Sequence, residues 1–138
     1  MIFNFLIFIF IITVGICTAT QECVWATGKL LCRHNQTLVL GSVVELWDED
    51  SMGILKLVDP DDKIAFTIIN SEDGIFEVSG CASDQDWLPG VKNRPEMFLK
   101  VLHNCNLDKK ELLVIKPTFN VFVPRTYDYH IQHPIILD

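Results

Sequence analysis

The sequence predicts an all-β protein, folded as an antiparallel β-sandwich of seven or eight strands. Short runs rich in β-branched and aromatic residues recur along the chain, and turn-forming residues separate them. No stretch shows the 3.6-residue apolar period of a long helix. A succession of short strands with frequent turns is typical of two packed antiparallel sheets.

Residues 1–19 are predicted to be a secretory signal peptide rather than part of the fold. Residues 1–16 are nearly all apolar and carry no charge, and Cys17 and Ala19 place small residues before a cleavage site that follows Ala19. The alternative is an uncleaved anchor, because no Lys or Arg precedes the run and its length approaches the roughly 17–20 residues that span a bilayer. The small residues favour cleavage.

Residues 20–138, roughly 119 residues, are predicted to form one domain with an extended C-terminal tail from about residue 127. The net charge of −7 belongs entirely to this part, because the signal peptide has no charged side chain. An acidic domain without a basic cluster is not a nucleic-acid-binding protein. No second apolar run is long enough for a transmembrane anchor, so a secreted, extracellular protein is expected.

Seven segments have the length and composition of strands. They are residues 27–33, 42–47, 64–69, 75–79, 97–104, 111–115 and 119–123. The Asp73-Gly74 pair is predicted to close a hairpin between the third and fourth segments, because tight turns need the positive φ that glycine supplies. Residues 84–96, with two prolines and a glycine, are expected to form a long loop or a short helical turn.

Five short sequence motifs follow one another in an order that suggests a family. They are TGKLLC at 27–32, ELWDED at 45–50, DPDD at 59–62, EDGIFEVSG at 72–80 and FLKVLHNC at 98–105. These motifs resemble those of the nematode transthyretin-like proteins, and the resemblance covers residues 24–127. It implies a secreted, transthyretin-type (prealbumin-like, immunoglobulin-like) β-sandwich. Some members of that family act at cell surfaces as bridging or signalling ligands.

Four cysteines remain after removal of the signal peptide, an even number that predicts two disulfides in an oxidising compartment. Strand alternation puts Cys32 and Cys105 in line with apolar residues that point inward. We therefore expect a Cys32–Cys105 bond, which the family resemblance also implies, and Cys23–Cys81 as the remaining pair. The alternative is that the second pair is unpaired or intermolecular. No CxxC or CxxH spacing occurs, so no zinc site is predicted.

Acidic residues gather in two segments, at 48–50 and 59–62, which flank a short connection. Clustered carboxylates can bind a hard cation such as calcium. Neither segment fits the twelve-residue helical calcium loop, however, and charged runs are commonly solvated turns. We expect the solvated turns, with no metal and no cofactor.

The histidines offer two further candidates. His130 and His133 form an HxxH spacing, but they lie in the predicted tail, where exposure to solvent is expected rather than metal binding. His103 lies on the inward face two residues before Cys105, where a hydrogen-bonded core residue is expected. The family has a histidine at this place.

Asn35, Gln36 and Thr37 form an N-x-Thr sequon in the turn between the first two predicted strands. In a secreted protein an exposed sequon is an acceptor for an N-linked glycan. Asn35 is the predicted glycosylation site, and an unmodified turn is the alternative.

The resemblance also raises two activities of relatives that share the sandwich. Hydroxyisourate hydrolases carry a histidine and arginine constellation and a C-terminal YRGS tetrapeptide, whereas this chain ends in PIILD and offers residues 28–32 on the corresponding first strand. No catalytic residue is predicted. A carrier of a small apolar ligand would need an oligomer with a central channel, and the sequence leaves the oligomeric state open.

The remaining interpretation is a non-enzymatic binding or signalling module whose partner is an extracellular or cell-surface protein or lipid. Trp47 is expected to point outward from the second predicted strand, because it alternates with the inward Val44 and Leu46. Trp87 lies in the long loop. Exposed tryptophans often anchor protein interfaces, so these two are the candidate binding surface. The alternative is that either caps the core.

Overall fold

A computed structural model describes residues 19–49, 60–85, 94–106, 109–116, 120–123 and 126–138. These residues form nine strands and one short 3-10 helix. In chain order they are β1 (Ala19–Leu31), η1 (Gln36–Val39), β2 (Val43–Asp48), β3 (Asp62–Ile68), β4 (Ile75–Gln85), β5 (Met97–His103), β6 (Glu111–Ile115), β7 (Asn120–Val123), β8 (Thr126–His130) and β9 (Ile135–Ile136). Within these ranges no helix has the length and apolarity to cross a bilayer.

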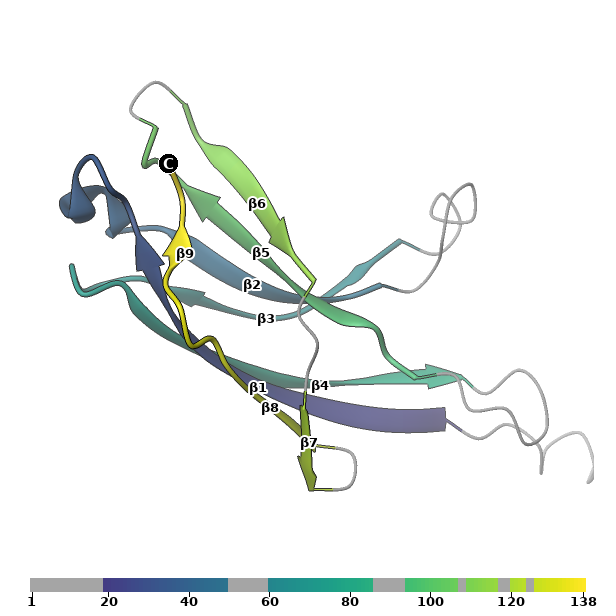
Figure 1. The fold of residues 1–138 in the computed structure, drawn as a ribbon. Coiled ribbons are helices and arrows are strands. Elements are labelled where there is room, and N and C mark those ends of the chain that lie inside the picture. Colours follow the sequence, from purple (N-terminus) through teal and green to yellow (C-terminus); the bar gives the residue numbers. More distant parts are fainter. Residues whose placement is uncertain (1–18, 50–59, 86–93, 107–108, 117–119, 124–125) are drawn as a thin grey trace, which may run out of the picture.

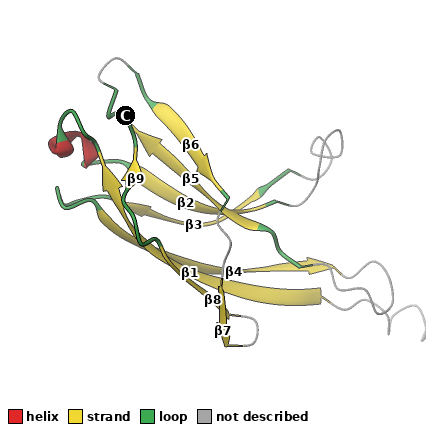
Figure 2. Ribbon diagram, in the orientation of Figure 1, coloured by secondary structure: helices red, strands yellow, loops and turns green. Residues whose placement is uncertain are grey.

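The strands form two sheets that face each other (Figures 1 and 2). One sheet has the order β4-β1-β8-β7, with β9 added to β1, and the other has the order β3-β2-β5-β6. The predicted all-β, two-sheet architecture is confirmed. The strands are not all antiparallel, however, because β8 and β9 both pair with β1 in parallel, and the described strands outnumber the seven or eight predicted.

The first strand is longer than the sequence predicts. It begins at Ala19 instead of residue 27 and pairs with β4 from Ala19↔Gln85 to Lys29↔Ile75. The inward positions of its first half include the polar residues Thr20 and Glu22, both buried. These two polar residues hide the alternation of apolar and polar residues that would indicate a strand. The predicted signal peptide, apart from Ala19, lies outside the described residues.

The segment from residue 127 is not a free tail, as the sequence suggested. It runs along β1, first as β8 and then as β9, and the backbone N–H groups of Ile131 and Leu137 donate to the carbonyls of Thr27 (3.0 Å) and Leu31 (3.0 Å). Leu137 is buried in the core. Pairing between chain segments about 100 residues apart leaves little signature in either of them. His133 is exposed as expected, and the side chain of His130 lies outside the described residues.

The core lies between the two sheets and is built from alternate residues of the strands. Each strand turns every second side chain inward, so the fully buried Val44 and Leu46 of β2 lie beside Leu99 and Val101 of β5. The remaining members are Val24, Ala26, Leu30, Cys32, Val39, Ile69, Phe76, Val78, Met97, Cys105 and Leu137.

Ser71–Gly74 forms the predicted turn, but not the predicted hairpin. The N–H of Gly74 donates to Ser71 O (3.1 Å), and Gly74 has a φ of 69°. A Cβ on Gly74 would lie 2.3 Å from Leu30 O, so the close approach of β1 also requires glycine. β3 pairs with β2 and β4 pairs with β1, so this turn carries the chain from one sheet to the other. A turn motif therefore predicts where the chain reverses, but it does not predict which strand the following strand pairs with.

The end of β4 also differs from the sequence prediction. Asp84 and Gln85 belong to β4 instead of the predicted loop, because β4 continues alongside the first half of β1. Residues 94–96 have no regular secondary structure, and residues 86–93 lie outside the described part.

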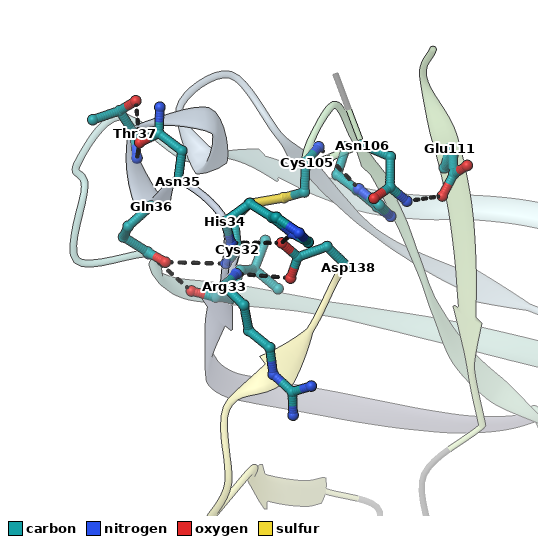
Figure 3. The surroundings of a disulfide bond; sticks show 12 residues. Cys32, Arg33, His34, Asn35, Gln36, Thr37, Cys105, Asn106, Glu111 and Asp138 are labelled. Atoms are coloured by element: carbon teal, nitrogen blue, oxygen red, sulfur yellow. Dashed lines mark hydrogen bonds and ion pairs between the residues drawn. A yellow bond between two sulfur atoms is a disulfide. The ribbon is translucent and has the colours of Figure 1, made fainter. Parts of the chain in front are cut away.

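Both predicted disulfides are formed. Cys32–Cys105 joins the residue after β1 to the segment after β5, so it connects the two sheets, and both cysteines are buried (Figure 3). Cys23–Cys81 connects directly opposed residues of β1 and β4 within one sheet, where Cys81 is exposed. One bond therefore holds the sandwich together, and the other reinforces a strand pair.

Candidate binding surface

The outer faces of the two sheets differ in character. The outward residues of β1 and β4 are mostly polar, with Trp25 and Ile75 as the exposed apolar side chains. The polar ones are Gln21, Thr27, Lys29, Glu77, Ser79 and Ser83. A solvated face of this kind is ordinary for an antiparallel sheet.

The outer face of the β3-β2-β5-β6 sheet carries an apolar stripe across all four strands. We define the apolar stripe as Val43, Phe66, Ile68, Leu102, Leu112 and Val114. The side chains on the two outer strands are strongly exposed: Phe66 by 59%, Ile68 by 51%, Leu112 by 56% and Val114 by 48%. Val43 and Leu102 are half-buried between them. Large contiguous apolar patches on a soluble protein mark interaction sites.

Trp47 stands on the same outer face, beside the stripe, as the sequence predicts. Its Nε1 donates to Glu45 Oε2 (2.8 Å), and the Lys100 ammonium lies 3.4 Å from the centre of its ring. Lys63 Nζ donates to Glu45 Oε1 (2.9 Å). We call Glu45, Trp47, Lys63 and Lys100 the tryptophan cluster. The cluster uses a hydrogen bond, an ion pair and a cation–π contact to hold its side chains against the sheet.

The electrostatics of the tryptophan cluster favour a charged Glu45. Partial burial acts to raise the pKa of Glu45, but the hydrogen bonds from Lys63 and Trp47, and then the charges of Lys63 and Lys100, act against it. The net result is a pKa below the usual value for glutamate. Glu45 is therefore an anion at neutral pH in the middle of this face.

The second tryptophan of the predicted surface, Trp87, lies outside the described residues. The stripe residues on β3 and β6 were not predicted from the sequence. In the segment around Phe66 and Ile68 the alternation of large and small residues was visible, but which set faces the core was not. In β6 four consecutive apolar residues follow Glu111, so no periodicity separates the outward pair from the inward pair.

The two acidic segments do approach each other, because Asp48 and Asp62 are directly opposed on β2 and β3. They help to line a depression of about 420 Å³ beside the Cys23–Cys81 disulfide. Its other lining residues are Lys63, Ile64, Cys81, Ala82 and Ser83. In the described part of the chain no three His, Cys, Asp or Glu side chains are grouped to hold a metal ion. Asp50 and Asp59 lie outside that part.

His103 is a buried residue of the inner face, with 4% of its surface exposed. The backbone N–H of Cys105 donates to its Nδ1 (3.4 Å), which requires the tautomer protonated at Nε2. Burial lowers the pKa of His103, and the charges of Glu111 and Asp138, which act to raise it, do not compensate. His103 is therefore neutral at pH 7 and is a hydrogen-bonded core residue, as expected.

Asn35, the predicted glycan acceptor, is the exposed N-cap of η1 between β1 and β2. Its Oδ1 accepts hydrogen bonds from the backbone N–H of Thr37 (3.1 Å) and from Thr37 Oγ1 (2.8 Å) (Figure 3). The sequon thus lies at the surface with its Asn and Thr side chains in contact.

Comparison with known proteins yields little. Neither the family models nor the curated proteins include a match to this chain. Among solved structures, a 9R-lipoxygenase from Cyanothece PCC8801 is similar, with 21% sequence identity and a TM-score of 0.45. The similarity covers 91% of this chain and 19% of that chain, so this protein spans about a fifth of the lipoxygenase.

Proposed function

We propose that this protein is a secreted, transthyretin-like domain that acts as a non-enzymatic binding module at cell surfaces or in extracellular fluid. The observation that carries the proposal is the apolar stripe, with four strongly exposed apolar side chains on one outer sheet face. Leaving such side chains in water costs free energy that a protein partner recovers by covering them, at about 25 cal/mol per Å² of buried apolar surface.

The frame beneath the stripe suits a binding role. β2 and β5 lie at the centre of the sheet and are fixed by the fully buried Val44, Leu46 and Leu99. Side chains on rigid strands lose little conformational freedom on binding, so less affinity is lost to ordering them. The charged tryptophan cluster beside the stripe adds polar groups of the kind that orient a partner at the rim of an interface.

Two properties support an extracellular, non-enzymatic protein. The two disulfides are typical of an oxidising compartment. The burial of His103 supports a non-catalytic role, because a general base has to reach the proton that it abstracts. The transthyretin-like assignment rests on the five sequence motifs, and the two-sheet architecture is consistent with it.

Competition binding to intact cells and extracellular matrix tests the proposal. Oxidised, labelled protein should bind saturably and be displaced by unlabelled protein. The variant Phe66→Ser/Leu112→Ser, which removes apolar side chains from the two outer strands of the face, should bind at least tenfold more weakly, because two such side chains contribute roughly 1.4 kcal/mol or more.

Ile75→Ser is the matched control, because Ile75 is exposed by 63% and lies on the outer face of the other sheet. It should bind like the wild type. Equal thermal stability of all three proteins would show that the fold is intact. Absent or non-saturable binding of the wild type, or undiminished binding of the stripe variant, would reject the proposal.

A further inference from the structure

We infer that the first partner of the apolar stripe is a second copy of this chain, packed face to face as a symmetric dimer. The inference rests on the proposed function only in taking the stripe as an interface. It adds the identity of the partner and the way the two faces align. The argument comes from the register of the four strands.

Two rows of outward residues cross the sheet at the apolar stripe, and a third row, Lys63, Trp47 and Phe98, lies beside the second. The first row is Ile68, Val43, Leu102 and Leu112, and the second is Phe66, Glu45, Lys100 and Val114. In each row the residues follow the strand order β3, β2, β5, β6. The first row is apolar throughout. The second is apolar at both ends and has an acidic and a basic residue side by side at its centre.

This arrangement is complementary to itself. A two-fold axis parallel to the strands and midway between β2 and β5 would place β2 on the second copy's β5 and β3 on its β6. Ile68 would then face the second copy's Leu112, and Phe66 its Val114. Two sheets that pack with nearly aligned strands lie about 10 Å apart, which suits interdigitated side chains of these sizes.

The charges at the centre of the face obey the same symmetry. The axis sets Glu45 against the second copy's Lys100, and Lys100 against the second copy's Glu45. Glu45 retains acceptor capacity, because each carboxylate oxygen has two lone pairs and each accepts one hydrogen bond within the tryptophan cluster. Both side chains are already largely covered within one copy, with 20% and 19% exposed. Their further desolvation on association is therefore small.

The overall charge of −7 acts against association of two copies, but on this face lysines balance the described carboxylates. It presents Lys63, Lys100 and Lys116, and its described carboxylates Glu45, Asp61 and Glu49 each form an ion pair with one of these lysines. The outward residues of β1 and β4, which are mostly polar, offer neither the apolar rows nor the central charge pair.

Sedimentation velocity over a range from roughly micromolar to hundreds of micromolar tests the dimer. The oxidised protein should sediment with twice the monomer mass at the upper end. Phe66→Ser/Leu112→Ser should remain a monomer, and the control Ile75→Ser should dimerise like the wild type. These three side chains are exposed, so the substitutions leave the core intact.

A charge exchange tests the alignment. Glu45→Lys and Lys100→Glu should each be monomeric, because each sets like charges against each other across the axis. An equimolar mixture of the two variants should form a heterodimer. In it the introduced lysine of one variant meets the introduced glutamate of the other, and the native Glu45 and Lys100 that remain also face each other. Repulsion within each chain is unchanged by mixing, so restored association would come only from contacts between the copies.

The two proposals fail separately. A wild type that stays monomeric, or a dimer that the stripe substitutions leave intact, would overturn the self-association, while the cell-binding assay would still decide the proposed function. A wild-type dimer that is lost in the stripe variant would support the inference. If the stripe variant nevertheless bound cells as strongly as the wild type, the proposed function would fail while the dimer stood. A mixture of charge variants that stays monomeric, with both variants folded, would overturn the alignment.

Discussion

The Asp138 carboxylate holds His34 by two hydrogen bonds, from the backbone N–H (2.8 Å) and from the imidazole Nδ1 (2.7 Å) (Figure 3). The other carboxylate oxygen accepts from the N–H of Arg33 (2.7 Å). These bonds fasten the residue that follows the buried Leu137 to the turn beside the Cys32–Cys105 disulfide. The end of β1 and the segment after β9 are thereby joined through side-chain as well as strand contacts.

Asp138→Asn should loosen this junction. The backbone N–H groups of His34 and then Arg33 lower the pKa of Asp138 to about 2, against the raising effect of burial. A depressed carboxylate pKa stabilises the fold above the unfolded value of 3.8, and the contribution is lost as the pH falls toward 2. The variant should show a lower thermal midpoint at pH 7 and faster hydrogen exchange at Arg33 and His34.

The control for this prediction is Glu77→Gln, which removes an exposed carboxylate from the outer face of β4. It should leave the exchange of those two amides unchanged. A titration of Asp138 by NMR with a midpoint near its unperturbed value would contradict the assignment of the hydrogen bonds.

Mild acid should destabilise the protein through His103. Its pKa is lowered in the fold, so between that value and the unfolded value of 6.5 the unfolded chain binds more protons than the native protein. The contribution of His103 should be complete above about pH 7 and should decrease as the pH falls through 6.5 toward its lowered pKa in the fold. Urea unfolding midpoints at a series of pH values measure this, and His103→Gln should flatten the profile. An equally steep profile in that variant would assign the effect to another group.

The two disulfides should differ in accessibility and in stabilising effect. Their sequence separations of 58 and 73 residues correspond to loop-closure contributions of about 4 kcal/mol each, so loop length does not distinguish them. Burial distinguishes the two disulfides, because Cys32 and Cys105 are in the core and Cys81 is exposed. Alkylation under increasing reductant, read by peptide mass, should label Cys23 and Cys81 first.

The paired substitutions complete that test. Cys32→Ala/Cys105→Ala should lower the unfolding free energy more than Cys23→Ala/Cys81→Ala, because it also leaves a cavity between the sheets. Equal losses, or earlier labelling of the buried pair, would contradict the difference in packing.

Asn35 should carry an N-linked glycan when the protein is secreted from a eukaryotic cell. Peptide N-glycosidase should reduce the mass of the wild type and leave Asn35→Asp unchanged. Asp at this position retains the oxygen that caps η1, so the variant separates loss of the glycan from loss of the cap. Thr37→Ser should retain the glycan, because serine preserves the sequon. A wild-type protein without a glycan would contradict the prediction and favour the alternative, an unmodified turn at Asn35.

The sequence predicted the strands whose signal is local. β2 and β5 were located to within a residue or two, and β6 to the residue, because β-branched and aromatic runs bounded by turn residues identify a strand without its partner. The inward direction of Cys32 and Cys105 followed from alternation with apolar neighbours, and so did the outward direction of Trp47. Each of these predictions needs only the two-residue period of one strand.

Apart from the start of β1 and the end of β4, the predictions that were wrong concern strand partners. Asp73-Gly74 predicted a hairpin, yet β3 and β4 enter different sheets. The segment after residue 127 looked like a tail because its pairing with β1 joins distant parts of the chain. The apolar stripe was missed for the same reason, since the outward faces of β3 and β6 become one surface only when β2 and β5 lie between them.

By itself the sequence determined the all-β class, the expectation of two disulfides from four cysteines, the acidic charge and the direction of single side chains. These properties depend on composition and on a two-residue period, which each segment carries alone. Only the tertiary structure decided which strands are neighbours. Those neighbours in turn determine that β8 and β9 pair with β1 in parallel and that the outward residues of four strands line up as the rows of the apolar stripe. Strands pair through backbone hydrogen bonds between segments that can be far apart in the chain. Any exposed strand edge of suitable length offers the same backbone groups, so the sequence of one strand does not specify its partner.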